Sequence, residues 1–465
     1  MCLRCYDART NVRLIVWGQT EHAGPASDSP MPITQVNHPS TTAAAPSAST
    51  RAALVVVTSL FFMWGFVTAL NDVLIPHLKS IFDLNYAKAS LIQFAFFFAY
   101  FVFSIPAARL IDAIGYKRTM VTGVLVMGGG ALLFLPAAAV PSYPLFLGAL
   151  MVLACGITIL QVAANPYVAV LGPPKTASSR LNLSQAFNSL GTTVAPLLGG
   201  YLILNAAAKS MGELRQMAPD ALQAYRVHEA SSVKVPYLII GLALLVLGFL
   251  ISTFKLPPLP GAEHHKGDAS DSLWRYRHLI LGAIGIFVYV GAEVSIGSFM
   301  INYFGQPEIG NISASAASRY LTVYWFCAMV GRFIGSAILR KMRTGTLLGF
   351  AAIAATMLVF ISMASTGHIA MGSMILIGLC NSVMFPSIFT LGIADLGPRT
   401  GDGSGLLIMA IVGGAIVPLC VGVLADRIGL QRSFILPAIC YLYIVYYAFR
   451  GSRVFVTARE RAPQA

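Results

Sequence analysis

Two acidic residues, Asp72 and Glu293, lie inside long apolar stretches, whereas the other acidic residues fall in tails, loops or the ends of such stretches. A charge at the centre of a membrane helix costs about 2.5 to 3.5 kcal/mol on insertion scales, so intramembrane acids usually line a wet cavity and act there. Because burial disfavours the charged carboxylate, such a group can exchange a proton near neutral pH. We therefore predict proton coupling by both acids and substrate contact by Asn71 beside Asp72. The alternatives are a capping role for Asp72 at a bend before Pro76 and an interhelical hydrogen bond for Glu293.

Neutral amides recur at helical spacing in two other apolar stretches. Gln161 and Asn165 are one turn apart, and Asn182, Gln185 and Asn188 follow at intervals of three, so that each set occupies one helix face. Amides donate and accept hydrogen bonds, as sugar hydroxyls do, without placing a permanent charge in lipid. We predict that Gln161, Asn165, Gln185 and Asn188 contact a sugar. Amide bonding between helices is the alternative.

Aromatic side chains in the same stretches are candidates for stacking on the apolar face of a sugar. Placement in the aromatic belts at the membrane surface is the alternative for each. The candidates are Trp64, Tyr289, Tyr320, Tyr324 and Trp325.

The elements that carry these residues are apolar runs long enough to cross a bilayer. The 465-residue chain is 57% hydrophobic and 11% charged, which is not the composition of a water-soluble domain. Runs of eighteen or more mainly apolar residues recur throughout and predict an all-α membrane protein with twelve transmembrane helices. The predicted spans are 52–75, 88–111, 118–138, 143–170, 181–205, 234–254, 279–303, 316–340, 345–366, 368–393, 403–424 and 432–450.

The net charge of +13 does not indicate a nucleic-acid partner. With twelve spans and both termini in the cytoplasm, most Lys and Arg residues fall on inner segments, as the positive-inside rule requires. The lipid bilayer is therefore the expected partner, and nucleic acid is excluded.

The spans divide into two six-helix halves. We predict a disordered tail over residues 1–50, rich in Ser, Thr, Ala and Pro, an N-terminal half over 51–254, a cytoplasmic loop over 255–278, a C-terminal half over 279–450 and a tail over 451–465. Both Met1 and Met31 are candidate start residues. Short basic loops follow the second and eighth spans, the latter containing Gly331-Arg332-Phe333. Such a pairing suggests parallel repeats around a central cavity.

Four strings resemble those of a known transporter family. They are Asn71-Asp72, the segment Gln161 to Val168, the segment Arg180 to Ser189, and Gly331-Arg332-Phe333. Together they resemble the fucose permease family of the major facilitator superfamily, and within it the bacterial glucose/galactose permeases. The resemblance covers roughly residues 52–450.

The resemblance implies a major facilitator fold that imports a hexose with a proton by alternating access, in the inner membrane of a bacterium. The family's Asn-Asp motif, whose acid is thought to couple the proton, matches Asn71-Asp72, and its amides on the fifth helix match Gln185 and Asn188. Where the fucose permease has a glutamate tied to sugar binding, this chain has Gln161. That departure favours glucose or galactose over fucose and leaves more of the coupling to Asp72.

The loop from Arg109 to Arg118 resembles the superfamily's signature between helices two and three, but it lacks the first glycine and the arginine after Asp112. We interpret it as a degenerate inner gate, with Asp112, Arg118 and Arg332 as gating residues.

Other functions remain as alternatives. An exporter that exchanges protons for another solute and a nontransporting sugar sensor share the same features, whereas no metal-ligand set or nucleophile motif indicates an enzyme. We expect no cofactor and no metal, a proton as coupling ion with sodium as the alternative, and function as a monomer.

Overall fold

The structure, a computed structural model, describes residues 48–82, 86–140, 142–203, 216–259 and 272–454. The predicted tails 1–50 and 451–465 lie largely outside these residues, as do residues 260–271 of the predicted loop 255–278. The described part is helical throughout, which confirms the predicted fold class. The longer helices are α1 (Ala48–Phe82), α2 (Tyr86–Ala139), α3 (Tyr143–Val170), α4 (Ala177–Ile203), α6 (Pro219–Ser231), α7 (Lys234–Thr253), α8 (Arg277–Phe304), α9 (Ala314–Ile338), α10 (Thr344–Ala364), α11 (Gly367–Asn381), α12 (Met384–Gly392), α13 (Thr400–Met409), α14 (Gly413–Ile428) and α16 (Ile435–Tyr446).

Ten helical segments of the described chain are long and apolar enough to cross a membrane. One of them, within α2, supplies two crossings, because Gly115 adopts φ 78° and ψ 165° and turns the chain between them. The amide-rich α4 is not among the ten and adds another. The sum is twelve crossings, in agreement with the predicted spans.

Short irregular segments divide three of the C-terminal crossings. α11 ends at Asn381 and α12 begins at Met384, α13 and α14 are joined by the 3-10 turn Ala410–Val412, and α16 runs into the π-helical segment Tyr447–Gly451. The first break leaves the Asn381 carbonyl in place to accept a hydrogen bond from another helix.

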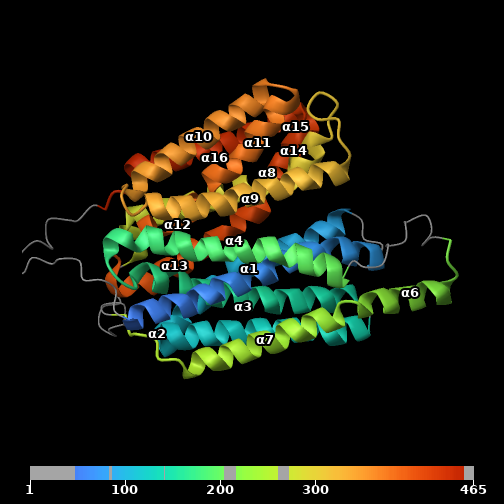
Figure 1. The fold of residues 1–465 in the computed structure, drawn as a ribbon, viewed down its shortest axis with the longest axis horizontal. Helices are drawn as coiled ribbons and strands as arrows, with labels where there is room; N and C mark the ends of the chain where they lie inside the picture. Colours follow the sequence, from blue (N-terminus) through green and yellow to red (C-terminus); the bar gives the residue numbers. More distant parts are fainter. Residues whose placement is uncertain (1–47, 83–85, 141, 204–215, 260–271, 455–465) are drawn as a thin grey trace, which may run out of the picture. The chain divides into compact units, whose positions relative to one another are not determined.

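The N-terminal helices pack closely at glycines. α1 lies against α4, and α2 against α3 and α7, as Figure 1 shows in blue to green. A Cβ atom added to Gly65 on α1 would lie 2.2 Å from the backbone oxygen of Asn188, and one added to Gly191 on α4 would lie 2.2 Å from that of Phe62. Such contacts need small residues. They fix α1 against the face of α4 that carries the predicted amides.

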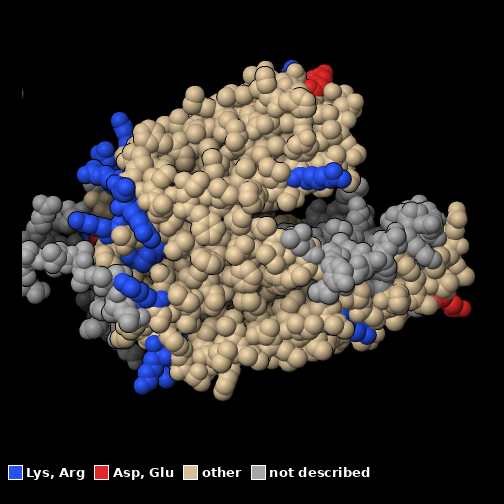
Figure 2. All heavy atoms as spheres, in the orientation of Figure 1, with Lys and Arg blue, Asp and Glu red and all other residues tan. Residues whose placement is uncertain are grey.

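The two halves meet near the end of the helices where Lys and Arg gather, at the left of Figure 2. We call this the basic end; exposed basic residues on it include Arg118, Lys175, Arg340, Lys341 and Arg343.

Hydrogen bonds join the halves close to the basic end. Ser178 Oγ on α4 bonds Thr344 Oγ1 (2.8 Å) and Thr390 Oγ1 (2.7 Å) on α10 and α12. Ser404 on α13 donates to the carbonyl of Val162 on α3 (2.7 Å). These buried bonds close the halves on each other at this end.

Candidate functional site

A small polar cavity of about 140 Å³ lies between the two halves. Its N-terminal wall comes from α1, α3 and α4, and its C-terminal wall from α8, α9, α12 and the turn after α13. The lining residues are Trp64, Gln161, Gln185, Asn188, Tyr289, Val290, Glu293, Arg332, Phe385 and Ile411.

The amides of the N-terminal wall are held in a chain of hydrogen bonds. Gln161 Nε2 donates to Tyr100 OH (2.7 Å), and Asn165 Nδ2 donates to the Gln161 carbonyl (3.0 Å). Gln185 Nε2 donates to Asn165 Oδ1 (3.3 Å), and Asn188 Nδ2 donates to the carbonyl of Phe61 (2.9 Å). With these donors occupied, the wall is pre-organised rather than flexible.

The structure separates the predicted sugar contacts into two groups. Gln161, Gln185 and Asn188 line the cavity, whereas Asn165 is fully buried behind it and orients Gln185. Asn165 therefore takes the alternative role, an amide hydrogen bond between two helices. Asn71 lies on α1, but its side chain is outside the described part of the chain, as is that of Asp72.

Glu293 lies on α8 and lines the cavity, as its predicted role in proton coupling requires. Its Oε1 is buried, and no residue of the described chain bonds it. Tyr289 lies one helical turn away on the same wall, and the guanidinium of Arg332 is near enough for the two charges to interact. A carboxylate held in this way can exchange a proton with the cavity.

Arg332 is not in a loop, and the prediction that placed it there was wrong. It lies within α9 and lines the cavity. Its guanidinium donates to Ser189 Oγ and to the Gln185 carbonyl (3.4 Å), while its own carbonyl accepts from Asn182 Nδ2 (2.7 Å). These bonds to α4 provide the polar partners that an arginine needs inside a membrane helix. Arg332 thus ties α9 to the amide-bearing helix.

Behind Glu293, a buried cluster of tyrosines surrounds the break at Asn381. Tyr289 OH donates to the Asn381 carbonyl (3.1 Å), and Asn381 Nδ2 donates to Tyr324 OH (2.9 Å). The OH of Tyr441 and Oδ1 of Asn381 are buried, with no bond to any described residue. The two hydrogen bonds at Asn381 brace the C-terminal wall from behind.

The aromatic predictions divide in the same way. Trp64 and Tyr289 line the cavity and Tyr324 braces it from behind, but Tyr320 and Trp325 are exposed on the surface of α9. These two residues therefore do not line the cavity.

The other gating candidates lie toward the basic end, away from the cavity lining. Asp112 is half-buried on α2. Its Oδ1 would lie 3.8 Å from a Cβ atom added to Gly401, in the first turn of α13. A carboxylate is favoured beside a helix N-terminus. Arg118 is exposed.

The apolar lining from Val290, Phe385 and Ile411 was not predicted. These residues have no polar group that would distinguish them from the other apolar residues of their spans.

Comparisons with known proteins give one consistent family. The sequence model of the Major Facilitator Superfamily matches residues 55–411. A glucose/galactose transporter of Brucella abortus is 53% identical over 402 residues, covering 86% of this chain and 94% of the relative. The L-fucose-proton symporter of Escherichia coli is 38% identical over 398 residues, covering 84% of this chain and 91% of the relative. The crystal structure of the transporter FucP in the outward conformation matches with a TM-score of 0.82 and 36% identity, over 87% of this chain and 100% of that one.

Proposed function

Because the chain belongs to the major facilitator superfamily, we propose that it is a secondary active transporter that imports a hexose together with a proton by alternating access. The observation that carries the proposal is the cavity between the halves, which has amides on one wall and a carboxylate and a guanidinium on the other. Such a site can hold hydroxyl groups and a titrating proton together.

The sugar binds against the N-terminal wall. Gln161, Gln185 and Asn188 each retain acceptor oxygens, and their donors can exchange partners with sugar hydroxyls at little cost. Trp64 supplies an aromatic surface for the apolar face of a pyranose ring. The relatives named for glucose and galactose are more similar than the one named for fucose, and they support an aldohexose as cargo.

Glu293 and Asp72 carry the coupling proton. Glu293 faces the bound sugar, and its unbonded Oε1 is free to accept a proton or a sugar hydroxyl. We assign Asp72, on α1, the same role because it matches the acid of the family's Asn-Asp motif. A proton is the coupling ion, with sodium as the alternative that the assay below distinguishes.

Arg332 couples protonation to the movement of the halves. When Glu293 is charged, it competes with Ser189 for the guanidinium, and when it is protonated, Arg332 has only its partners on α4. Neutralising Glu293 would therefore strengthen the link between α9 and α4. Asp112 and Arg118 act at the basic end, where the halves must part to release sugar.

We place the basic end in the cytoplasm, with both termini on that side, following the positive-inside rule. The relatives are bacterial, which supports the inner membrane as the location. Both walls of the cavity come from one chain, which supports a functional monomer.

The test is uptake of labelled glucose, galactose and fucose into proteoliposomes, driven by a pH gradient in one set and by a sodium gradient in another. We expect the pH gradient to drive accumulation, and Glu293→Gln and Asp72→Asn to abolish accumulation while retaining sugar exchange, because a neutral amide mimics the protonated acid. Accumulation driven by sodium alone would refute proton coupling. Binding of a hexose without flux would indicate a sensor, and neither binding nor flux would refute the sugar assignment.

A further inference from the structure

A second and larger hollow lies on the apolar outer surface, separate from the hexose cavity. It has a volume of about 790 Å³ and runs along α1 between α7 and α4. We call it the trough; its lining consists of Leu54, Val55, Thr58, Ser59, Phe62, Met63, Leu183, Phe187, Ala243, Val246, Leu247 and Leu250. None of these residues lines the polar cavity.

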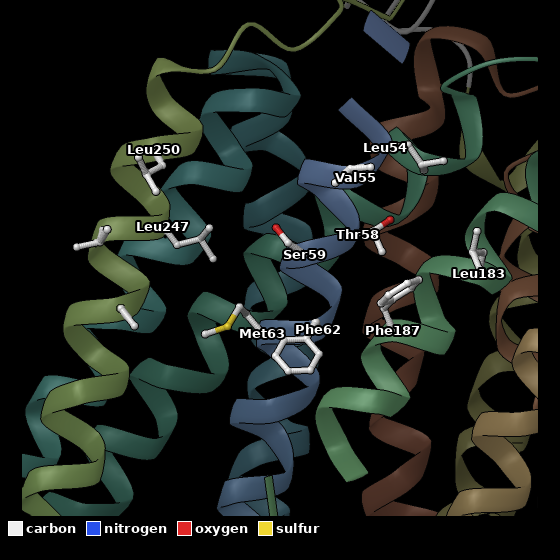
Figure 3. Close-up of a pocket in the computed structure, with 12 residues that line it drawn as sticks. Leu54, Val55, Thr58, Ser59, Phe62, Met63, Leu183, Phe187, Leu247 and Leu250 are labelled. Atoms are coloured by element: carbon white, nitrogen blue, oxygen red, sulfur yellow. The ribbon is translucent and has the colours of Figure 1, made fainter. Parts of the chain in front are cut away.

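The trough has the form of a channel for one chain-like ligand. In Figure 3, α1 supplies the floor through Val55, Ser59 and Met63, while Leu247 and Leu250 on α7 stand along one side and Phe187 on α4 along the other. Thr58 Oγ1 bonds Ser184 Oγ (3.1 Å), so the hydroxyl nearest α4 is satisfied within the protein. The lining is otherwise almost wholly apolar, which suits a hydrocarbon and not a sugar.

Two basic side chains lie just beyond the trough, at the basic end of the helices that form it. Arg51 precedes Val55 by one helical turn, on the same face of α1, and is exposed. Lys255 is also exposed and follows the end of α7 five residues after Leu250. A headgroup above the hydrocarbon would therefore meet positive charge.

We propose that the trough is a binding site for one anionic phospholipid, with an acyl chain along α1 and the phosphate beside Arg51 and Lys255. The long apolar lining selects an acyl chain, and the two cations select an anionic headgroup over a zwitterionic one. The site lies on α1 and α4, the two helices that carry Trp64, Gln185 and Asn188. It is distinct from the transport site and does not depend on the hexose proposal.

The test uses the full chain in nanodiscs of phosphatidylcholine with added phosphatidylglycerol that bears a photoactivatable group in one acyl chain. Labelled peptides are mapped by mass spectrometry. Val246→Trp fills the trough, and Val423→Trp, on α14 and outside the trough, is the control, because these valines are 57% and 56% exposed.

We expect labelling of the α1 and α7 peptides to fall about tenfold in Val246→Trp, the effect of withdrawing roughly two methylene groups from the site, and to be unchanged in Val423→Trp. Arg51→Gln and Lys255→Gln should each lower labelling by phosphatidylglycerol about fivefold. The same change at Lys341, elsewhere on the basic end, should have no effect.

Three results would overturn the proposal. Labelling spread over all exposed helices, and equal in the two tryptophan variants, would mean ordinary annular lipid. An absence of trough labelling in the unaltered chain would mean that protein covers the surface. Equal labelling by a phosphatidylcholine probe would show that the site does not select an anionic headgroup.

Discussion

Adding a single methyl group at Gly65 tests whether the packing of α1 on α4 positions the hexose site. In the structure, a Cβ at this position would lie 2.2 Å from the backbone oxygen of Asn188 and 2.6 Å from its side-chain nitrogen, whereas ordinary contacts begin at 3.4 Å. The nearest obstacle is backbone, so a rotamer change cannot relieve it. Gly65→Ala must separate the helices or turn Asn188 away from the cavity.

The expected magnitudes follow from these contacts. Overpacking of this kind costs about 1 to 3 kcal/mol, which exceeds the gain of about 0.4 to 1 kcal/mol that Gly→Ala brings in an unstrained helix. Displacement of Asn188 removes one neutral hydrogen bond to the sugar, worth about 0.5 to 1.5 kcal/mol. We therefore expect a lower unfolding temperature and a hexose affinity reduced by up to about tenfold.

The assay is hexose binding to purified protein, measured beside thermal unfolding in detergent. Gly129→Ala on α2 is the matched control, because a Cβ there has no neighbour within 4 Å and should leave both quantities unchanged or slightly improved. Wild-type affinity and stability in Gly65→Ala would refute the close packing of α1 on α4 and the placement of Asn188 that depends on it.

Three further predictions concern charge and the contact between the halves. Glu293→Gln should flatten the rise in hexose accumulation that the unaltered protein shows as the outer pH falls; an unchanged pH profile would exclude this residue from coupling. Arg332→Gln removes charge-assisted bonds to α4 worth about 1.5 to 3 kcal/mol and should increase the separation of spin labels on α4 and α9; an unchanged distance distribution would contradict the link. Ser404→Ala removes the bond to the Val162 carbonyl and should weaken closure at the basic end by about 0.5 to 1.5 kcal/mol, seen as faster thiol labelling of a cysteine introduced there; no change in rate would count against it.

The sequence predicted the crossings because their signals are local. Tyr143–Val170 has the predicted bounds, and the turn between the second and third crossings falls at Gly115, between the predicted spans. The amide-rich α4 is less apolar than its neighbours but was still predicted, over 181–205, as one of the apolar runs. The short helix α6 (Pro219–Ser231) was not predicted, since it does not cross the membrane and has no long apolar run.

The site was predictable where the type of a residue, polar or aromatic, distinguishes it from the rest of its apolar span. Gln161, Gln185 and Glu293 face the cavity because polar groups in an apolar span have few other places to go. Asn165 is also an amide in an apolar span, yet it is buried behind Gln185. The rotation of α3 against α4 decides which amide faces the cavity, and the sequence does not give that rotation. Arg332 was assigned to a loop because basic residues gather there, and its partners on α4 are distant in sequence.

The division of polar groups between the walls accounts for how one site can serve both binding and coupling. Neutral amides on α3 and α4 present the same hydrogen bonds at any pH, so sugar affinity on that wall is independent of protonation. The charged pair lies on α8 and α9, and its arginine donates hydrogen bonds to α4 in the other half. We therefore propose that a proton on Glu293 acts on the contact between the halves, while the amides of the other wall keep their hydrogen bonds.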